Sequence, residues 1–146
     1  MQFWNEENRN SLIASASQGN ANSQYELGRC YIKGLNGFEQ DYDKAMNWFL
    51  KSAAQGNAYA QVELGRSYLY GRGVKQNYNK AIEWFEKAAN QNNPVAQYWL
   101  GEIYYKGLGV KQDYSKAIKW YERSADLGYI YILRCKWGIV SSLAMV

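Results

Sequence analysis

Hydrophobic and small residues recur along this chain with the period of a helix. Gln24, Leu27, Gly28 and Tyr31 are spaced as i, i+3, i+4 and i+7, so in a helix their side chains share one face. A glycine inside a helix costs about 1 kcal/mol relative to alanine. Gly28 therefore predicts a point on this face where another helix approaches closely.

A second helical pattern follows after a glycine-rich stretch. It runs through Ala45, Trp48, Phe49 and Ala53, where small residues alternate with large aromatic ones. Such an alternation favours side chains of one helix fitting between those of the next. The two patterns together predict a pair of packed helices, with the tryptophan in the core.

This pair of patterns occurs three times at a nearly constant spacing. The first pattern recurs with the dipeptides Leu27-Gly28, Leu64-Gly65 and Leu100-Gly101. The second recurs with Trp48, Trp84 and Trp120, and consecutive copies are 36 residues apart. We expect the three glycines to lie at helix contacts, the three tryptophans to lie in the core, and the second helices to end near Gly56, Asn92 and Gly128. An internal repeat of this length is typical of solenoids, in which each unit packs on its neighbours.

The repeats define the domain organisation. The segment Ser15–Asn20 matches Ser52–Asn57, which indicates a degenerate second helix that caps the N-terminal end. We expect one repeat domain over residues 1–146, divided into a capping helix (1–19), repeat 1 (20–56), repeat 2 (57–92), repeat 3 (93–128) and a C-terminal cap or tail (129–146).

The last segment departs from the repeat. A fourth Leu-Gly dipeptide is due at positions 136 and 137, but Lys136 and Trp137 stand there. The segment is apolar, and two interpretations stay open. In the first, the segment forms a final helix that closes the end of repeat 3, with a short strand over 129–132 as an alternative. In the second, the segment is an exposed surface for docking or for a homodimer.

The repeated positions resemble the Sel-one-like repeat, a relative of the tetratricopeptide repeat. Repeat 2 carries the motif nearly whole, as Gln61, Leu64, Gly65, Tyr68, Gly71, Gly73, Val74, Tyr78, Ala81, Trp84, Phe85, Ala88 and Ala89. Repeat 1 departs from it in the loop, where Phe38 replaces the valine. The resemblance covers roughly residues 8–128. It implies an all-α fold, a right-handed α-solenoid of antiparallel helix pairs, in proteins that act as adaptors and scaffolds.

In solenoids of this kind the first helix of each pair lines the concave surface. Positions that differ between the repeats, on the side of the helix away from the motif residues, are the candidates for binding a partner. They are rich in tyrosine, with one tryptophan and two arginines, which are residue types that dominate binding hot spots. The candidates are Tyr25, Arg29, Lys33, Tyr59, Val62, Glu63, Arg66, Tyr70, Tyr98, Trp99, Glu102, Tyr105 and Lys106.

Composition argues against several other functions. The chain has no histidine, the commonest general base and a common metal ligand, so we expect neither an enzyme nor a metal or other cofactor. Its 17 basic and 13 acidic residues are scattered, whereas nucleic-acid binders concentrate positive charge. Cys30 and Cys135 have no metal-clip spacing, and we interpret them as small buried residues. The acidic N-terminal segment is unlike a secretory signal and no apolar stretch is long enough to cross a membrane, so we expect a cytoplasmic protein, which the resemblance makes bacterial.

The sequence thus predicts a module that binds a peptide or a protein domain in a concave groove. The resemblance leaves a second hypothesis, because some small bacterial members look like immunity proteins that neutralise a toxin by direct binding. A third hypothesis is a self-assembling structural module that dimerises through the apolar tail.

Overall fold

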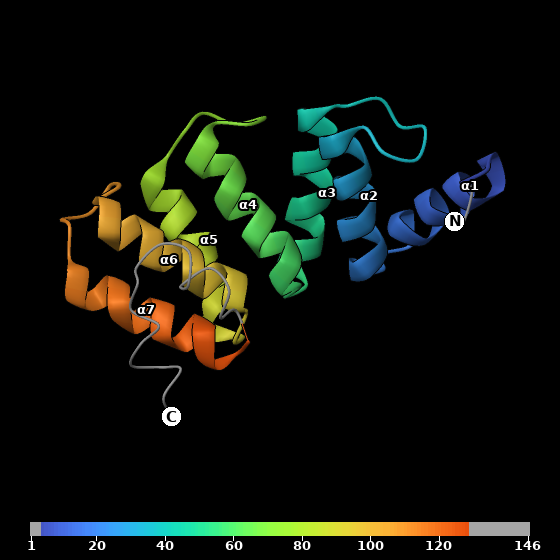
Figure 1. The fold of residues 1–146 in the computed structure, drawn as a ribbon. Helices are drawn as coiled ribbons and strands as arrows, with labels where there is room; N and C mark the ends of the chain where they lie inside the picture. Colours follow the sequence, from blue (N-terminus) through green and yellow to red (C-terminus); the bar gives the residue numbers. More distant parts are fainter. Residues whose placement is uncertain (1–3, 129–146) are drawn as a thin grey trace. The chain divides into compact units, whose positions relative to one another are not determined.

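The computed structural model describes residues 4–128, and within this range all regular structure is α-helical (Figure 1). Its helices are α1 (Glu6–Ser17), α2 (Ala21–Lys33), α3 (Tyr42–Ala54), α4 (Ala58–Tyr70), α5 (Tyr78–Asn90), α6 (Pro94–Lys106) and α7 (Tyr114–Asp126). The first helix of each repeat is α2, α4 or α6, and the second is α3, α5 or α7. The predicted all-α repeat fold is confirmed. The predictions for the tail at 129–146 lie outside the described residues.

Polar side chains define where the helices begin. Each first helix follows an asparagine, Asn20, Asn57 or Asn93, whose Oδ1 accepts the backbone N–H three residues later at 2.9–3.0 Å. The second helices begin in the same way after Asp41, Asn77 and Asp113, each at 3.0 Å. These bonds satisfy N–H groups that have no partner within the helix, and each contributes about 1 kcal/mol.

Residues with left-handed backbone conformation define where the helices end. The first helices end at Gly34, Gly71 and Gly107, with φ of 63°, 68° and 67°. The second helices end just before Gly56, Asn92 and Gly128, with φ of 89°, 59° and 98°. Glycine and asparagine adopt this region at the lowest cost, which confirms the predicted ends of the second helices.

Two of the three motif glycines mark a close approach within a helix pair. A Cβ atom on Gly28 of α2 would lie 2.6 Å from Cε1 of Phe49 in α3. A Cβ atom on Gly101 of α6 would lie 2.6 Å from Cε1 of Tyr121 in α7. No side chain fits at such distances, so the predicted helix contact is confirmed at both positions.

A buried glutamine ties each first helix to the end of the helix before it. The Nε2 atoms of Gln24, Gln61 and Gln97 donate to the backbone oxygens of Ala16, Ala53 and Ala89, at 3.1, 3.4 and 3.3 Å. Carbonyl groups in the last turn of a helix lack an intrahelical donor, and the glutamines supply one. Because α1 provides the acceptor for Gln24, it acts as the second helix that would precede repeat 1.

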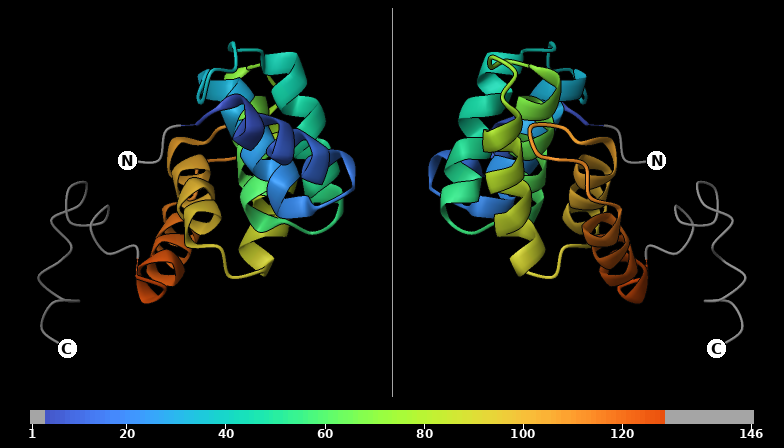
Figure 2. Two further views of the ribbon diagram at one scale, coloured as in Figure 1. Left: turned by 90° about the vertical axis from the view of Figure 1, so that its right-hand side faces the viewer. Right: turned by 90° about the vertical axis from the view of Figure 1, so that its left-hand side faces the viewer.

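The contacts divide the chain into two units, Met1–Trp84 and Phe85–Val146, with the division inside α5. In the first unit α2 and α3 lie side by side (Figures 1 and 2). Phe49 is fully buried there, in a cluster that includes Ala45, Ala60 and Leu64. In the second unit α6 packs along α7, and its buried residues include Leu100, Ile103 and Ala117.

The prediction that the repeated tryptophans lie in the core is wrong, because all three are only partly buried. Trp48 packs against a cluster that contains Leu27 and Phe38, but the Lys51 ammonium lies over its ring, 4.6 Å from the centroid. Arg123 covers the Trp120 ring in the same way at 4.9 Å. A basic residue three positions later on the helix covers an aromatic face through a cation–π contact, so the ring stays at the edge of the core.

Candidate partner-binding surface

The predicted binding residues of the first unit come together on α2 and α4. The Tyr25 and Tyr59 rings lie with their centroids 5.7 Å apart, and Arg29 lies over the Tyr25 ring at 5.8 Å. Tyr59 is 61% exposed, although most large aromatic side chains in a folded protein bury the greater part of their surface. We call Tyr25, Arg29, Tyr59, Glu63, Arg66 and Tyr70 the first-helix surface.

Charged residues of both signs flank these rings. Arg66 pairs with Glu63 at 3.4 Å, and Arg29 pairs with Glu26 at 3.3 Å. Burial raises the pKa of the Tyr25 phenol; the Arg29 charge opposes this and the Glu63 charge adds to it. At neutral pH Tyr25 therefore presents a neutral phenol between ion pairs, so the first-helix surface can donate a hydrogen bond as well as bury apolar area.

Two further predicted residues lie at the carboxyl ends of their helices. Tyr70, the last residue of α4, is 49% exposed, and Arg72 lies over its ring at 5.0 Å. Lys33, the last residue of α2, is exposed. Both residues are open to a partner.

In the second unit the predicted residues form an aromatic cluster. Trp99 of α6 stacks on Phe85 of α5, with centroids 6.0 Å apart and planes at 12°. Tyr98 contacts both Trp99 and Tyr121, at 5.7 and 5.8 Å. Their rings are partly buried, so they contribute to packing within the unit as well as to its surface. Tyr105 lies 5.3 Å from the ring of Tyr114 in α7.

The prediction that Glu102 and Val62 lie on the binding surface is wrong, because both are buried, at 3% and 5% exposure. The Tyr121 hydroxyl donates to Glu102 Oε1 at 2.6 Å, and the exposed Lys106 ammonium lies 3.2 Å from Oε2. Glu102 is thus held inside the repeat rather than offered to a partner. Val62 is an apolar side chain within the core, in register with the tyrosine that repeats 1 and 3 carry.

The exchange at position 102 has a counterpart on the facing helix. In register with Glu102, repeats 1 and 2 have Arg29 and Arg66, and in register with Tyr121 they have Phe49 and Phe85. Repeat 3 therefore replaces an arginine and a phenylalanine with a glutamate and a tyrosine that bond to each other. Burial, the hydrogen bond to Glu102 and its charge all raise the pKa of the Tyr121 phenol.

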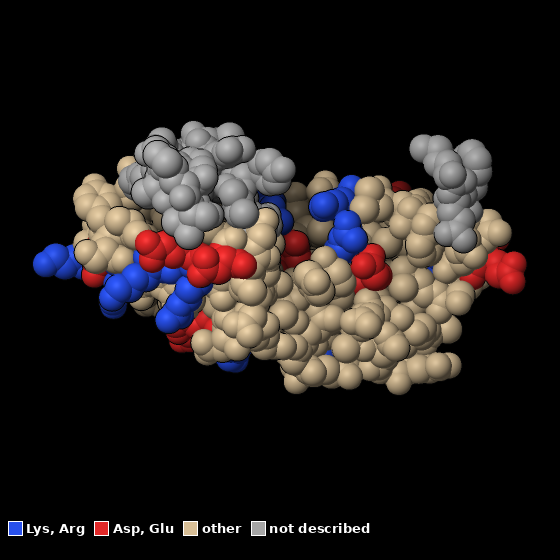
Figure 3. Space-filling model, turned by 60° about the horizontal axis from the view of Figure 1, so that its bottom comes forward, with Lys and Arg blue, Asp and Glu red and all other residues tan. Residues whose placement is uncertain are grey.

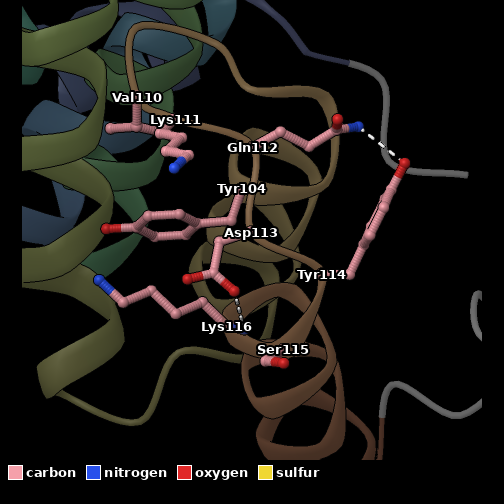
Figure 4. Close-up of a pocket in the computed structure, with 8 residues that line it drawn as sticks. All are labelled: Tyr104, Val110, Lys111, Gln112, Asp113, Tyr114, Ser115 and Lys116. Atoms are coloured by element: carbon pink, nitrogen blue, oxygen red, sulfur yellow. Dashed lines mark hydrogen bonds between the residues drawn. The ribbon is translucent and has the colours of Figure 1, made fainter.

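Sequence reasoning missed a second set of positions, where a loop enters a second helix. Residues 110–113, in the loop that follows Gly107 at the end of α6, and residues at the start of α7 line a hollow of 600 Å³ over Tyr104 (Figure 4). Equivalent residues line a hollow of 410 Å³ over Tyr68 in repeat 2. The available signal was the in-register recurrence of lysine at Lys75 and Lys111, and at Lys80 and Lys116.

The described part of the chain also limits other kinds of site. Among residues 4–128 no three side chains of the histidine, cysteine, aspartate or glutamate type converge as metal ligands do. No helix in this range is both long and apolar enough to cross a bilayer. On the face drawn in Figure 3, acidic and basic side chains are interspersed among other residues.

Three consecutive segments of the chain match the model of a known protein family. The model of the Sel1 repeat matches residues 21–57, 58–93 and 94–129. The chain belongs to the Sel1 repeat family. The match covers each helix pair from α2 to α7, and it confirms the resemblance seen in the motif residues. Sel1 repeats generally mediate protein–protein interactions, and proteins built from them are typically non-catalytic.

Two solved structures are similar to this chain. A Sel1 repeat protein from Oxalobacter formigenes is 31% identical, with a TM-score of 0.79, over 88% of this chain and 97% of that one. A protective antigen present in uropathogenic Escherichia coli strains, described as having an SLR fold, is 36% identical, with a TM-score of 0.80. That match covers 84% of this chain and 26% of the antigen.

A curated relative matches over a shorter stretch. The ERAD-associated E3 ubiquitin-protein ligase component HRD3A of Arabidopsis thaliana is 46% identical over 39 residues, which are 27% of this chain. The chain spans only 6% of the length of that relative.

Proposed function

We propose that this protein is a cytoplasmic interaction module that binds a protein partner through the first-helix surface. The observation that carries the proposal is the cluster of Tyr25, Tyr59 and Arg29 on α2 and α4, in which the exposed Tyr59 ring lies beside the half-buried Tyr25 ring and the Arg29 charge. Tyrosine and arginine are enriched where binding energy concentrates, because their side chains combine large contact area with hydrogen-bond donors.

The family supports a binding role and leaves the partner open. The relative from Arabidopsis is named as a component of a ligase assembly, so it too acts with other proteins. The first-helix surface would receive an extended segment or a folded domain, with Arg29 and Arg66 able to exchange their present carboxylate partners for carboxylates of the bound protein.

The test compares two variants in an affinity pull-down with cross-linking and mass spectrometry. Tyr59→Ala with Tyr70→Ala removes the two most exposed rings of the first-helix surface. Tyr42→Ala is the control, since Tyr42 is an exposed tyrosine on α3, a second helix of the same unit. Both variants are first compared with the wild type by circular dichroism and thermal unfolding.

We expect a partner that the wild type and Tyr42→Ala retain and the double variant loses. Equal recovery by all three proteins would remove the first-helix surface as the binding site. A single partner of very high affinity that is itself toxic would favour the immunity-protein hypothesis. A chain that sediments as a stable dimer and recovers no other protein would favour the self-assembling module instead.

A further inference from the structure

The hollows in repeats 2 and 3 are built from the same residues. Each is lined by a tyrosine of the first helix, a valine and a lysine from the loop, and a lysine from the first turn of the second helix. The shared lining of the repeat 2 hollow is Tyr68, Val74, Lys75, Gln76, Asn77 and Lys80. In repeat 3 the equivalent residues are Tyr104, Val110, Lys111, Gln112, Asp113 and Lys116.

Hydrogen bonds hold these loops in place. Gln76 Nε2 donates to the backbone oxygen of Leu69 at 2.7 Å, and Gln112 Nε2 donates to that of Tyr105 at 2.7 Å. Each glutamine thereby joins the loop to the last turn of the first helix. The hollows are consequently parts of the scaffold, formed before any ligand arrives, and binding in them costs little ordering entropy.

The lysines lie around the tyrosine ring. The Lys80 Nζ atom lies 5.3 Å from the centroid of the Tyr68 ring, and the Lys116 Nζ atom lies 5.1 Å from the centroid of the Tyr104 ring. In Figure 4 Lys111 and Lys116 approach the Tyr104 ring from opposite sides. Among residues 4–128, no carboxylate lies within ion-pair distance of Lys75, Lys80, Lys111 or Lys116. By contrast, Lys44 of repeat 1 pairs with Asp41 at 3.9 Å.

The charge of the lining differs between the repeats. Repeat 2 has two lysines and the neutral Asn77, whereas repeat 3 has two lysines and Asp113. In repeat 1 the residue in register with Lys75 is Glu39. The repeat 2 hollow is therefore the most positive, the repeat 3 hollow is less so, and repeat 1 lacks the lysine pair.

We propose that the hollows over Tyr68 and Tyr104 bind carboxylate side chains of an acidic segment in the partner protein. This inference rests on the proposed function and adds the chemistry of the partner. In each hollow two lysine ammonium groups supply the attraction, and no carboxylate of residues 4–128 lies within ion-pair distance of them. The tyrosine ring and the valine accommodate the methylene groups of an aspartate or glutamate. Phosphate and carboxylate groups can both bind at the free N–H groups of a helix N-terminus. Here the side chains of Asn77 and Asp113 already accept from the backbone N–H groups of Lys80 and Lys116, so the lysine ammonium groups, rather than these N–H groups, hold the carboxylate.

The experiment uses the full chain and a blocked peptide of alternating glutamate and glycine. The binding constant is measured by fluorescence anisotropy, and amide shifts in ¹⁵N spectra locate the site. The comparison peptide has glutamine in place of each glutamate, and inorganic phosphate is the competitor. The test variant is Lys75→Glu with Lys111→Glu, because it installs the residue that repeat 1 carries in the same loop. The control variant, Lys44→Gln with Lys51→Gln, removes two lysines from α3.

We expect the acidic peptide to shift the amides of 74–80 and 110–116, and its affinity to fall when salt is raised from about 0.05 M to about 0.5 M. Lys75→Glu with Lys111→Glu should weaken binding by about tenfold or more, and the control variant should change it by less than about twofold. Asp113→Asn, which gives repeat 3 the neutral cap of repeat 2, should tighten binding at 110–116.

Several results would overturn the inference. They are equal binding of the glutamine peptide, no binding of the acidic peptide, equal losses in the test and control variants, and phosphate binding at 74–80 at lower concentration than the peptide. A cellular partner that the Tyr59→Ala, Tyr70→Ala variant loses but the Lys75→Glu, Lys111→Glu variant retains would refute this inference alone. A peptide site without any partner that depends on Tyr59 and Tyr70 would instead refute the first-helix surface.

Discussion

The hydrogen bond between Tyr121 and Glu102 gives a quantitative test of how repeat 3 is held together. Tyr121→Phe removes one oxygen atom and leaves the ring, which packs against Gly101, in place. Tyr121 and Glu102 are both 3% exposed, so water does not readily replace the lost donor. The carboxylate keeps its contact with Lys106, whose exposed ammonium lies 3.2 Å from the other oxygen.

The expected cost follows from the class of interaction. A hydrogen bond to a charged group contributes about 1.5–3 kcal/mol. We therefore expect Tyr121→Phe to lower the free energy of unfolding by about 2 kcal/mol. With a urea m-value of about 2 kcal/mol/M for a chain of this size, the midpoint of unfolding falls by about 1 M.

Equilibrium unfolding in urea, followed by circular dichroism, measures this change. Tyr114→Phe is a suitable control, because its hydroxyl accepts a hydrogen bond from Gln112 at an exposed site and should contribute well under 1 kcal/mol. Repeats 1 and 2 offer a second comparison, since they combine phenylalanine with arginine at these positions. Glu102→Arg added to Tyr121→Phe should recover part of the loss, because it removes the buried carboxylate. A loss below about 0.5 kcal/mol in Tyr121→Phe, or a larger loss in the double variant, would refute this reasoning.

Three further predictions concern ionisation, packing and burial. The folded chain raises the pKa of the Tyr121 phenol above its ordinary value of 10.0, so its contribution to stability is complete below pH 10 and declines above it. Urea unfolding at pH 9 and pH 11 should thus show a steeper decline in the wild type than in Tyr121→Phe, and parallel declines would contradict the shift. Gly28→Ala should destabilise the chain by about 1–2 kcal/mol in the same assay, because overpacking against the buried Phe49 ring costs more than the helix propensity that alanine gains; a stabilised variant would show that α2 and α3 can separate. Burial raises the pKa of the Cys30 thiol, so in a Cys135→Ser background a disulfide reagent should modify it far more slowly in the native chain than in urea, and equal rates would show that the site opens readily.

The scaffold could be predicted from sequence because it is repeated. Three copies of one spacing distinguish positions that serve the fold from positions that differ between copies, and Gly28 and Gly101 lie at helix contacts as their recurrence indicates. The helix ends at Gly56, Asn92 and Gly128 were predictable for the same reason, since each needs a residue that tolerates positive φ.

The candidate site was harder to predict, because the burial of a side chain depends on contacts with other residues that a helical pattern does not reveal. Helical spacing places Glu102 on the outer side of α6, but the hydroxyl of Tyr121 and the close contact at Gly101 bring it into the repeat. In the same way, spacing places the tryptophans toward the core without showing that Lys51 and Arg123 cover their outer faces. The loops were overlooked because glycine-rich spacing indicates a turn and says little of the lysines beside it.

Variation between the repeats separates stability from binding in this chain. Where two facing positions change together, as at Glu102 with Tyr121, the exchange is satisfied inside the protein and needs no outside partner. Lys75 and Lys111 replace Glu39 of repeat 1 without any carboxylate of the described chain gaining contact with them, so this change leaves charge on the surface. A charged substitution that the fold itself does not compensate is the kind that a binding partner can use. By this criterion the loop hollows, rather than the buried Glu102, are where this protein should meet the charges of its partner. The arginines of the first-helix surface are already paired within the chain, so its case rests on the exposed rings of Tyr59 and Tyr70.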